Sequence, residues 1–181
     1  MSISENVFVV VYEMLSDRGY LNIESKEDLC IIARNNQDKR IIVYFVESVK
    51  VSVKKMKSIK DMIQNDHFGF HALILVYKST ITSFAKQFIT TDVDGLLVQV
   101  FSEKELCFNI TKHKLVPKHE LMTDTEKHDT LSEYKTKLKN YPNILCNDPV
   151  SKYYGFVPGN LIKITRKSPT VGTFVSYRVV V

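Results

Sequence analysis

Short apolar runs bounded by polar segments place the strongest constraint on how the first part of this chain can fold. They read IIVYFV at 41–46, HALILVY at 71–77 and LLVQVF at 96–101. Runs with little polar alternation are typical of strands buried on both faces of a sheet. Each run is far shorter than the roughly 18 apolar residues that a membrane helix needs. We therefore expect several strands of one internal sheet and no membrane-spanning segment.

Segments with the apolar spacing of a helix precede and separate these runs. Residues 6–18 repeat apolar side chains at intervals of three and four, and Gly19 follows as a natural helix end. Residues 51–64 predict a second helix, with an apolar stripe formed by Val53, Met56, Ile59 and Ile63. The alternation of helix and strand predicts a small α/β sheet domain with mixed or parallel strand order.

Two further elements are expected in this part of the chain. Ser25 is placed to cap a short helix that runs through Leu29 and Ile32. Residues 106–110 (LCFNI) predict a strand, joined to the preceding one by a tight turn at SEKE.

Charge is distributed unevenly along the 181 residues, a length that suits one domain or two small ones. Residues 1–111 carry 13 Lys and Arg against 14 Asp and Glu, whereas residues 112–181 carry 12 against 6. This difference predicts two modules, 1–111 and 112–181, with different partners. A basic half that simply keeps the protein in solution is the alternative.

Cysteine usage and the N-terminus suggest a reducing compartment. Cys30, Cys107 and Cys146 are odd in number and far apart, which predicts reduced, mostly buried thiols and no zinc site. The first residues, MSISENVFVVVYEM, carry acid before their apolar stretch and no basic segment, so we expect no signal peptide and an intracellular protein.

The second part contains several local structure signals. Thr123 and Glu126 have capping-box spacing before a helix whose apolar stripe is Leu131, Tyr134 and Leu138. In DPVSKYYG, Asp148 can cap a short helix with Pro149 in its first position and Gly155 past its end. Residues 112–122 predict a connector broken at Pro117, Pro158-Gly159 predicts a type II turn, and LIKITR and TFVSYRVVV predict two strands joined by a loop.

These last motifs carry a family resemblance. HKLVPKH, DPVSKYYG and PGNLIKITRKSPTVGTFVSYR, in this order within 111–181, resemble the fifth subunit shared by eukaryotic RNA polymerases I, II and III. The same segment is similar to the archaeal RNA polymerase counterpart, which consists of this C-terminal module alone. DRGY at 17–20, VSVKKMK at 51–57 and ITSFAKQF at 81–88 resemble the N-terminal jaw module of the eukaryotic subunit.

Two features depart from the family pattern. The jaw module is shorter than usual, which suggests a compact-genome eukaryote or a large DNA virus. The family's Thr-Pro-Ser-Ala turn, which approaches downstream DNA, corresponds here to Thr82-Ser83-Phe84-Ala85 and lacks the proline.

The resemblance implies an α/β N-terminal jaw module, a restriction-endonuclease-like sheet with helices, plus a small α+β C-terminal assembly module. It implies a non-catalytic subunit of DNA-directed RNA polymerase whose C-terminal module docks on the largest subunit and whose jaw sits near downstream DNA. The implied partners are the polymerase subunits and, weakly and non-specifically, duplex DNA. No membrane, small-molecule ligand or cofactor is expected. The implied location is the nucleus, or the cytoplasm or virion if the source is viral.

Two groups of residues are the candidate contact sites. Basic and aromatic side chains around the capped helix predict a subunit interface at Asp148, Pro149, Tyr153, Tyr154, Gly155, Arg166, Tyr177 and Arg178. Alternatively, two of Tyr153, Tyr154 and Phe156 seal the module's own core. The candidate DNA-facing residues are Lys54, Lys55, Lys57, Lys60, Thr82, Ser83 and Lys86, although a solvated lysine face has the same sequence pattern.

A stand-alone DNA-binding protein or metal-dependent nuclease is the alternative function. A nuclease of the endonuclease type needs an acid followed by Glu/Asp-x-Lys on the next strand to hold magnesium. Asp66 and Lys78 are suitably placed, but Val76 occupies the carboxylate position, and Glu47 and Lys50 are one residue too far apart. His67 and His71 lack further ligands nearby, so we expect neither catalysis nor a metal site.

Overall fold

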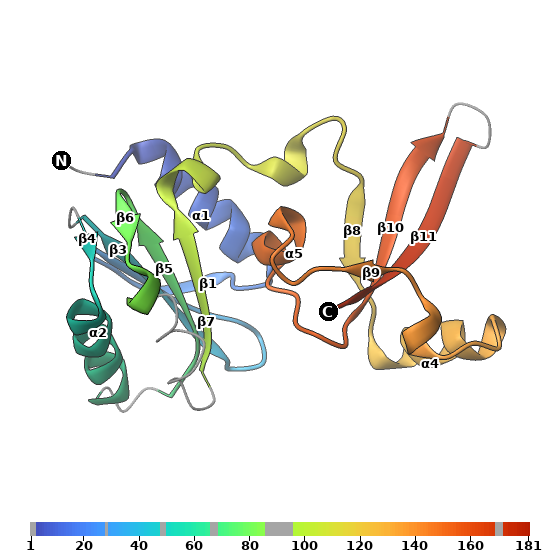
Figure 1. The fold of residues 1–181 in the computed structure, drawn as a ribbon, viewed down its shortest axis with the longest axis horizontal. Coiled ribbons are helices and arrows are strands. Elements are labelled where there is room, and N and C mark those ends of the chain that lie inside the picture. The colour runs from blue at the N-terminus through green and yellow to red at the C-terminus, as the bar shows by residue number, and fades with distance from the viewer. Residues whose placement is uncertain (1–2, 28, 48–49, 66–68, 86–95, 169–171) are drawn as a thin grey trace. The chain divides into compact units, whose positions relative to one another are not determined.

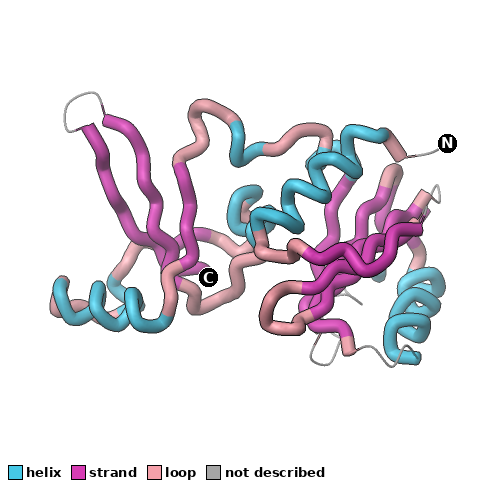
Figure 2. The backbone as a smooth tube through the Cα atoms, turned by 180° about the vertical axis from the view of Figure 1, so that it is seen from behind, coloured by secondary structure: helices cyan, strands magenta, loops and turns pink. Residues whose placement is uncertain are grey.

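The computed structural model describes the chain except for residues 1–2, 28, 48–49, 66–68, 86–95 and 169–171 (Figure 1). The chain forms two compact units, Met1–Phe108 (unit 1) and Asn109–Val181 (unit 2). Each unit is an assembly of helices and a sheet (Figure 2). Within the described part of the chain, every helix is too short or too polar to cross a membrane.

Unit 1 is built on a five-stranded mixed sheet with the order β1-β2-β3-β5-β7 (Figure 1). Its strands are β1 (Asn22–Glu27), β2 (Cys30–Arg34), β3 (Arg40–Val46), β5 (Phe70–Tyr77) and β7 (Leu97–Ser102). β3, β5 and β7 run parallel, whereas β1, β2 and β3 are antiparallel. A short parallel pair, β4 (Lys50–Val51) and β6 (Thr80–Ile81), lies outside this sheet. The predicted α/β class with mixed strand order is confirmed.

Helices on both faces explain why the central strands are apolar throughout. α1 (Glu5–Asp17) buries its apolar stripe, and its Phe8 ring lies 4.5 Å from that of Phe45 on β3. Successive strand residues point to opposite faces, so Ile42 and Val46 point away from α1. There they form a cluster with Met56 and Ile59 of α2 (Val53–Asn65). The two predicted helices therefore cover opposite faces of the sheet.

The helix expected after Ser25 is wrong, because this segment forms the hairpin β1–β2. Residues 30–34 alternate between buried and half-buried side chains, as a strand with one face on the core requires. Glu24 on β1 forms ion pairs with Arg34 at 3.2 Å and with Arg40 at 3.0 Å, which link all three antiparallel strands. Backbone pairing of β2 with β3 therefore outweighs the local preference of Ser25 for a helix N-cap.

The strand expected at 106–110 is also wrong. The segment forms the 3₁₀ helices η1 (Glu103–Leu106) and η2 (Ile110–Lys112). Ser102 and Glu105 make a reciprocal capping box, and Asn109 accepts a hydrogen bond from the Thr111 backbone N–H at 3.0 Å. These side-chain hydrogen bonds give the backbone partners that a strand would otherwise need from a neighbouring strand.

Unit 2 contains a four-stranded sheet with the order β8-β10-β11-β9. Its strands are β8 (Lys118–Leu121), β9 (Asn143–Ile144), β10 (Leu161–Ser168) and β11 (Gly172–Val180). The two strands predicted at LIKITR and TFVSYRVVV are confirmed as the antiparallel pair β10–β11, with Ile162, Ile164 and Val180 in one core cluster with Phe156. The predicted connector is wrong in its last part, because residues 118–121 pair with β10 as strand β8.

The predicted capping box of α4 (Asp124–Glu133) is confirmed. The Thr123 backbone N–H donates to Glu126 Oε2 at 2.8 Å, and Thr123 Oγ1 accepts from the Glu126 N–H at 3.3 Å. The helix ends earlier than expected, since Tyr134 is its C-cap and Lys135 has φ +45°. The expected apolar stripe is therefore incomplete: Leu131 is half-buried and the Tyr134 side chain is 57% exposed.

The turn at Pro158-Gly159 is confirmed by a φ of +88° at Gly159 and a hydrogen bond from the Asn160 N–H to the Val157 carbonyl at 3.1 Å. The three cysteines are free thiols, as predicted. The expectation that most of them are buried is wrong, because Cys107 is exposed and Cys30 and Cys146 are half-buried.

The capping box makes a prediction about stability in acid. Hydrogen bonds from Thr123 hold the pKa of Glu126 below its ordinary value of 4.5. A carboxylate with a lowered pKa in the folded state contributes stability above the ordinary value, and this contribution is lost as the pH falls through the lowered pKa. We expect Glu126→Gln to reduce the difference in unfolding midpoint between pH 7 and about pH 3, measured by urea titration of circular dichroism.

Asp129→Asn is the matched control, because it removes a carboxylate from an exposed site on the same helix. An unchanged pH dependence in Glu126→Gln, or an equal change in Asp129→Asn, would contradict this account.

Candidate functional site

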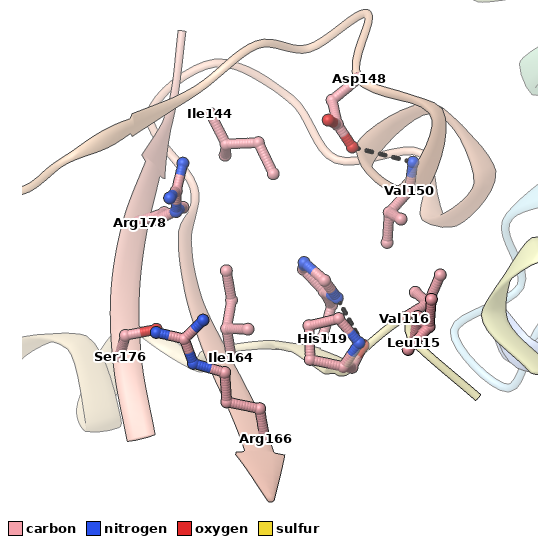
Figure 3. Close-up of a pocket in the computed structure, with 11 residues that line it drawn as sticks. Leu115, Val116, His119, Ile144, Asp148, Val150, Ile164, Arg166, Ser176 and Arg178 are labelled. Atoms are coloured by element: carbon pink, nitrogen blue, oxygen red, sulfur yellow. Dashed lines mark hydrogen bonds between the residues drawn. The ribbon is translucent and has the colours of Figure 1, made fainter. Parts of the chain in front are cut away.

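A pocket of about 320 Å³ lies on one face of the unit 2 sheet (Figure 3). The segment 115–117, strands β8 to β11, and the start of α5 (Pro149–Tyr154) contribute its lining. Its apolar lining residues are Leu115, Val116, Pro117, Ile144, Val150 and Ile164. Its polar lining residues are His119, Asp148, Arg166, Ser176 and Arg178. The pocket therefore combines an apolar floor with basic groups at its edge.

Strand register places both arginines on this face. Ile162 pairs with Arg178, Ile164 with Ser176, and Arg166 with Phe174. Side chains of paired residues lie on the same face of a sheet, so the alternation that buries Ile164 also directs Arg166 and Arg178 to the pocket. The prediction that these arginines lie on adjacent strands is confirmed.

Each arginine is held by a neighbour. Arg178 donates a hydrogen bond from Nη1 to the Asn143 carbonyl at 3.1 Å. The Arg166 guanidinium lies over the Phe174 ring, 5.0 Å from its centroid. Such contacts reduce the side-chain freedom that a bound partner would have to remove.

α5 forms one wall of the pocket, and its predicted capping is confirmed in full. The Asp148 carboxylate accepts a hydrogen bond from the Val150 backbone N–H at 2.9 Å (Figure 3). Pro149 occupies the first turn, where a missing N–H is harmless. Gly155 ends the helix with φ +72°, a conformation that glycine adopts without strain. Asp148 thus lines the pocket and orders its wall at the same time.

The aromatic residues after this helix belong largely to the core of unit 2. Tyr153 is 2% exposed and Phe156 is 7% exposed, so the prediction that two of the three aromatics seal the core is confirmed. Tyr153 accepts a hydrogen bond on its hydroxyl from Asn109 Nδ2 at 2.8 Å. Tyr154 is half-buried, and its ring stacks on Phe156 with centroids 5.3 Å apart. Tyr153 and Phe156 therefore have their side chains inside the fold, whereas Tyr154 keeps part of its side chain at the surface.

Tyr177 does not lie with the arginines. It follows Ser176 and precedes Arg178 on a strand, so its side chain points to the opposite face of the sheet. There it makes edge contacts with Tyr134 and Tyr141, at centroid distances of 6.1 and 6.2 Å. Burial raises the pKa of Tyr177 and Tyr141, and the neighbouring Tyr134 and Glu133 add to this effect. The predicted interface set is therefore divided between two faces.

Sequence reasoning missed the residues that come from the connector. His119 faces Ile164 across β8 and β10, and its Nδ1 lies 2.8 Å from the Pro117 carbonyl oxygen (Figure 3). Leu115 and Val116 line the same pocket. The partial alternation of apolar and polar residues in LVPKHEL was a signal for a strand, but Pro117 favoured the prediction of an irregular segment.

The described candidate DNA-facing residues of unit 1 lie on α2 and on the turn at 82–85. Lys54 and Lys57 are exposed on α2, whereas the side chains of Lys55 and Lys60, and residue Lys86, lie outside the described residues. Thr82 Oγ1 accepts a hydrogen bond from the Ala85 N–H at 3.2 Å, so it caps the helical turn at 83–85. Ser83 and Phe84 are exposed there, Phe84 to 76%. This turn forms without the family's proline.

Val76, Lys78 and His71 are among the described residues that were considered for nuclease chemistry or for metal binding. Val76 is fully buried in β5, and Lys78 Nζ lies 3.8 Å from Glu103 Oε2. Asp66 and His67 lie outside the described residues, and His71 is exposed. Among the residues that the structure describes, no three His, Cys, Asp or Glu side chains cluster to hold a metal ion.

Comparison with known proteins assigns the class of unit 2. Residues 108–180 match the family described as RNA polymerase Rpb5, C-terminal domain. A protein of Dictyostelium discoideum named DNA-directed RNA polymerases I, II, and III subunit rpabc1 is 37% identical over 186 residues, covering 94% of this chain and 93% of its own length. The chain therefore belongs to the RPABC1 family of RNA polymerase subunits, and the resemblance of its motifs is confirmed.

Other relatives extend the comparison. Subunit RPABC1 of Caenorhabditis briggsae is 36% identical, covering 93% of this chain and 80% of that protein. DNA-directed RNA polymerase V subunit 5C of Arabidopsis thaliana is 31% identical, and the alignment covers 94% of this chain and 80% of that protein. A solved restriction-modification enzyme bound to DNA has a TM-score of 0.44 at 15% identity over 78% of this chain and 10% of that chain. This last likeness supports no statement about fold, and the endonuclease-like description of unit 1 stays a prediction.

The Tyr153–Asn109 hydrogen bond predicts a stability effect. We expect Tyr153→Phe to lower the free energy of unfolding by about 1–3 kcal/mol, because it removes the acceptor of a buried hydrogen bond. Tyr134→Phe removes a hydroxyl from a ring that is 57% exposed, and we expect a change within about 0.5 kcal/mol. Urea unfolding of both variants measures the difference, and equal effects would contradict the assignment.

Proposed function

We propose that this protein is a non-catalytic subunit of a DNA-directed RNA polymerase. The observation that carries the proposal is the extent of the family match, since the Dictyostelium relative, named as a polymerase subunit, aligns with 94% of this chain. Both units are therefore shared with proteins that are named as parts of one enzyme complex. The chemistry of polymerisation lies in other subunits, and this chain contributes binding surface and rigidity.

The C-terminal unit docks on the largest polymerase subunit in this proposal. Support comes from the pocket, where Arg166 and Arg178 offer several N–H donors beside an apolar floor. The predicted interface keeps Asp148, Pro149, Tyr154 and Gly155 around α5. Tyr153 acts indirectly, by holding that helix in the core, and Tyr177 belongs to a separate face.

The N-terminal unit acts as a jaw beside downstream duplex DNA in this proposal. Contact there is weak and independent of base sequence, because phosphate attraction requires only positive charge. Lys54 and Lys57 support it, since both are exposed on one helix. The exposed Ser83 and Phe84 give the neighbouring turn a polar and an aromatic group for contact with the same duplex.

The location follows from the assembly. In a cellular host the protein works in the nucleus, and in a viral setting it works in the cytoplasm or virion. The relatives' names give no support to the stand-alone nuclease or DNA-binding alternative, and Val76 stands where a metal-binding carboxylate would be needed.

Affinity purification tests the assembly. We expect a tagged full-length chain to recover the two largest polymerase subunits from its host at moderate salt, while the purified chain alone incorporates no nucleotide into RNA. The tag without the chain is the control. Recovery of no polymerase subunit would overturn the proposal, as would cleavage of linear duplex by the pure chain with magnesium.

The jaw assignment predicts a salt effect on DNA binding. A protein that neutralises phosphates releases counterions, so its affinity falls with salt in proportion to the number of contacts. We expect the double variant Lys54→Gln/Lys57→Gln to reduce the slope of log affinity against log salt by about two for duplex DNA of any sequence.

The matched control is Lys39→Gln/Lys104→Gln, which removes the same charge from two other exposed sites of unit 1. An unchanged slope in the α2 variant, or an equal reduction in the control, would argue against DNA contact at α2.

A further inference from the structure

The pocket of unit 2 leaves apolar surface accessible beside its basic edge. Ile144 and Ile164 form a nearly buried floor, 8% and 6% exposed, so the accessible apolar surface comes mainly from the residues around it, of which Val116 and Val150 are half-buried at its sides. Leu115 lies at the margin with 83% of its side chain exposed. A hollow lined mostly by aliphatic side chains, with a few polar groups at its edge, is typical of binding sites.

The charges around this floor are unbalanced. Arg166 and Arg178 contribute two guanidinium groups, and among the described residues neither forms an ion pair. Asp148 is the one acidic residue in the described lining, and its carboxylate caps α5 through the Val150 N–H. The pocket is therefore complementary to a group that carries negative charge.

The lining favours a polypeptide over a nucleic acid. Single-stranded nucleic acids bind largely by stacking bases on aromatic rings, yet none of the described lining residues is a Phe, Tyr or Trp. The volume of about 320 Å³ lies at the small end of ligand pockets and suits one or two side chains. An aliphatic floor beside two planar donors matches an aliphatic side chain followed by a carboxylate, because guanidinium and carboxylate can form paired hydrogen bonds.

We propose that this pocket binds an acidic-aliphatic segment of a partner polypeptide. An aliphatic side chain of that segment lies on Ile144 and Ile164, covered by Leu115, and flanking carboxylates accept hydrogen bonds from Arg166 and Arg178. The inference rests on the proposed function, because it names the kind of segment through which another polymerase subunit is held. The contacts that already fix both guanidinium groups lower the entropy lost on binding.

The probe for this inference is a fluorescent, terminally blocked peptide in which Leu-Ile is flanked on each side by Glu-Asp. We expect it to bind the full-length chain, measured by fluorescence anisotropy, with an affinity that falls as salt is raised. Two comparison peptides separate the contributions: one with Gln-Asn flanks removes the charge, and one with Ser-Asn at the centre removes the aliphatic group. Each should bind at least about tenfold more weakly.

Variants of the protein assign the site. We expect Arg166→Gln and Arg178→Gln each to weaken binding about tenfold, and Leu115→Ser to weaken binding by acting on the aliphatic half alone. Lys167→Gln is the matched control, because it removes a charge from an exposed neighbour whose side chain points to the other face of β10. All four substituted positions are exposed, so we expect each variant to remain folded, and circular dichroism checks this.

The outcomes distinguish this inference from the proposed function. Absence of peptide binding, equal weakening by Lys167→Gln, or Arg-dependent binding of single-stranded DNA in place of the peptide would each overturn the inference. If the Arg166→Gln/Arg178→Gln chain recovers polymerase subunits as well as wild type does, the pocket is not the anchor, although the proposed function stands. Failure of wild type to recover any subunit overturns the function, while the peptide titration still tests the pocket.

Discussion

The antiparallel pairing of β10 with β11 is the interaction on which the candidate site depends. Its register sets Ile162 against Arg178 and Ile164 against Ser176, so one face of the hairpin carries both core and basic groups. A shift of β10 by one residue would move Arg166 to the face opposite Arg178 and expose Ile162 and Ile164. Because burial of Ile162 and Ile164 opposes that shift, the core of unit 2 also fixes the position of the guanidinium groups.

The capped helix α5 couples the core to the pocket in a similar way. Asp148, Pro149 and Gly155 set where the helix begins and ends, which directs Tyr153 into the core and Val150 toward the pocket. Local backbone chemistry and tertiary packing thus agree over this short segment. Such agreement between local and tertiary preferences is typical of a segment that folds to a single conformation.

Several elements were predictable because their signals are local. The strands around 41–46 and 71–77, the buried Met56 and Ile59 of the α2 stripe, and the caps of α4 and α5 all depend on neighbours within a few residues. The side chain of Ile63, the last member of that predicted stripe, lies outside the described residues. The errors fell where distant pairing decided the outcome. Ser25 precedes a good helix-start pattern, yet β2 is a strand because β3 supplies partners for its backbone. Residues 118–121 are a strand because β10 lies beside them.

By itself the sequence determined the family, the caps of α4 and α5, and the pair of arginines on neighbouring strands, since each depends on residues close together along the chain. Only the tertiary structure decided which residues share a surface. It separated Tyr177 from Arg178, placed Tyr153 inside the core, and brought His119 and Leu115 to the arginines. The physical reason is that side chains alternate across a strand, while the identity of its neighbours depends on long-range burial that no local pattern contains.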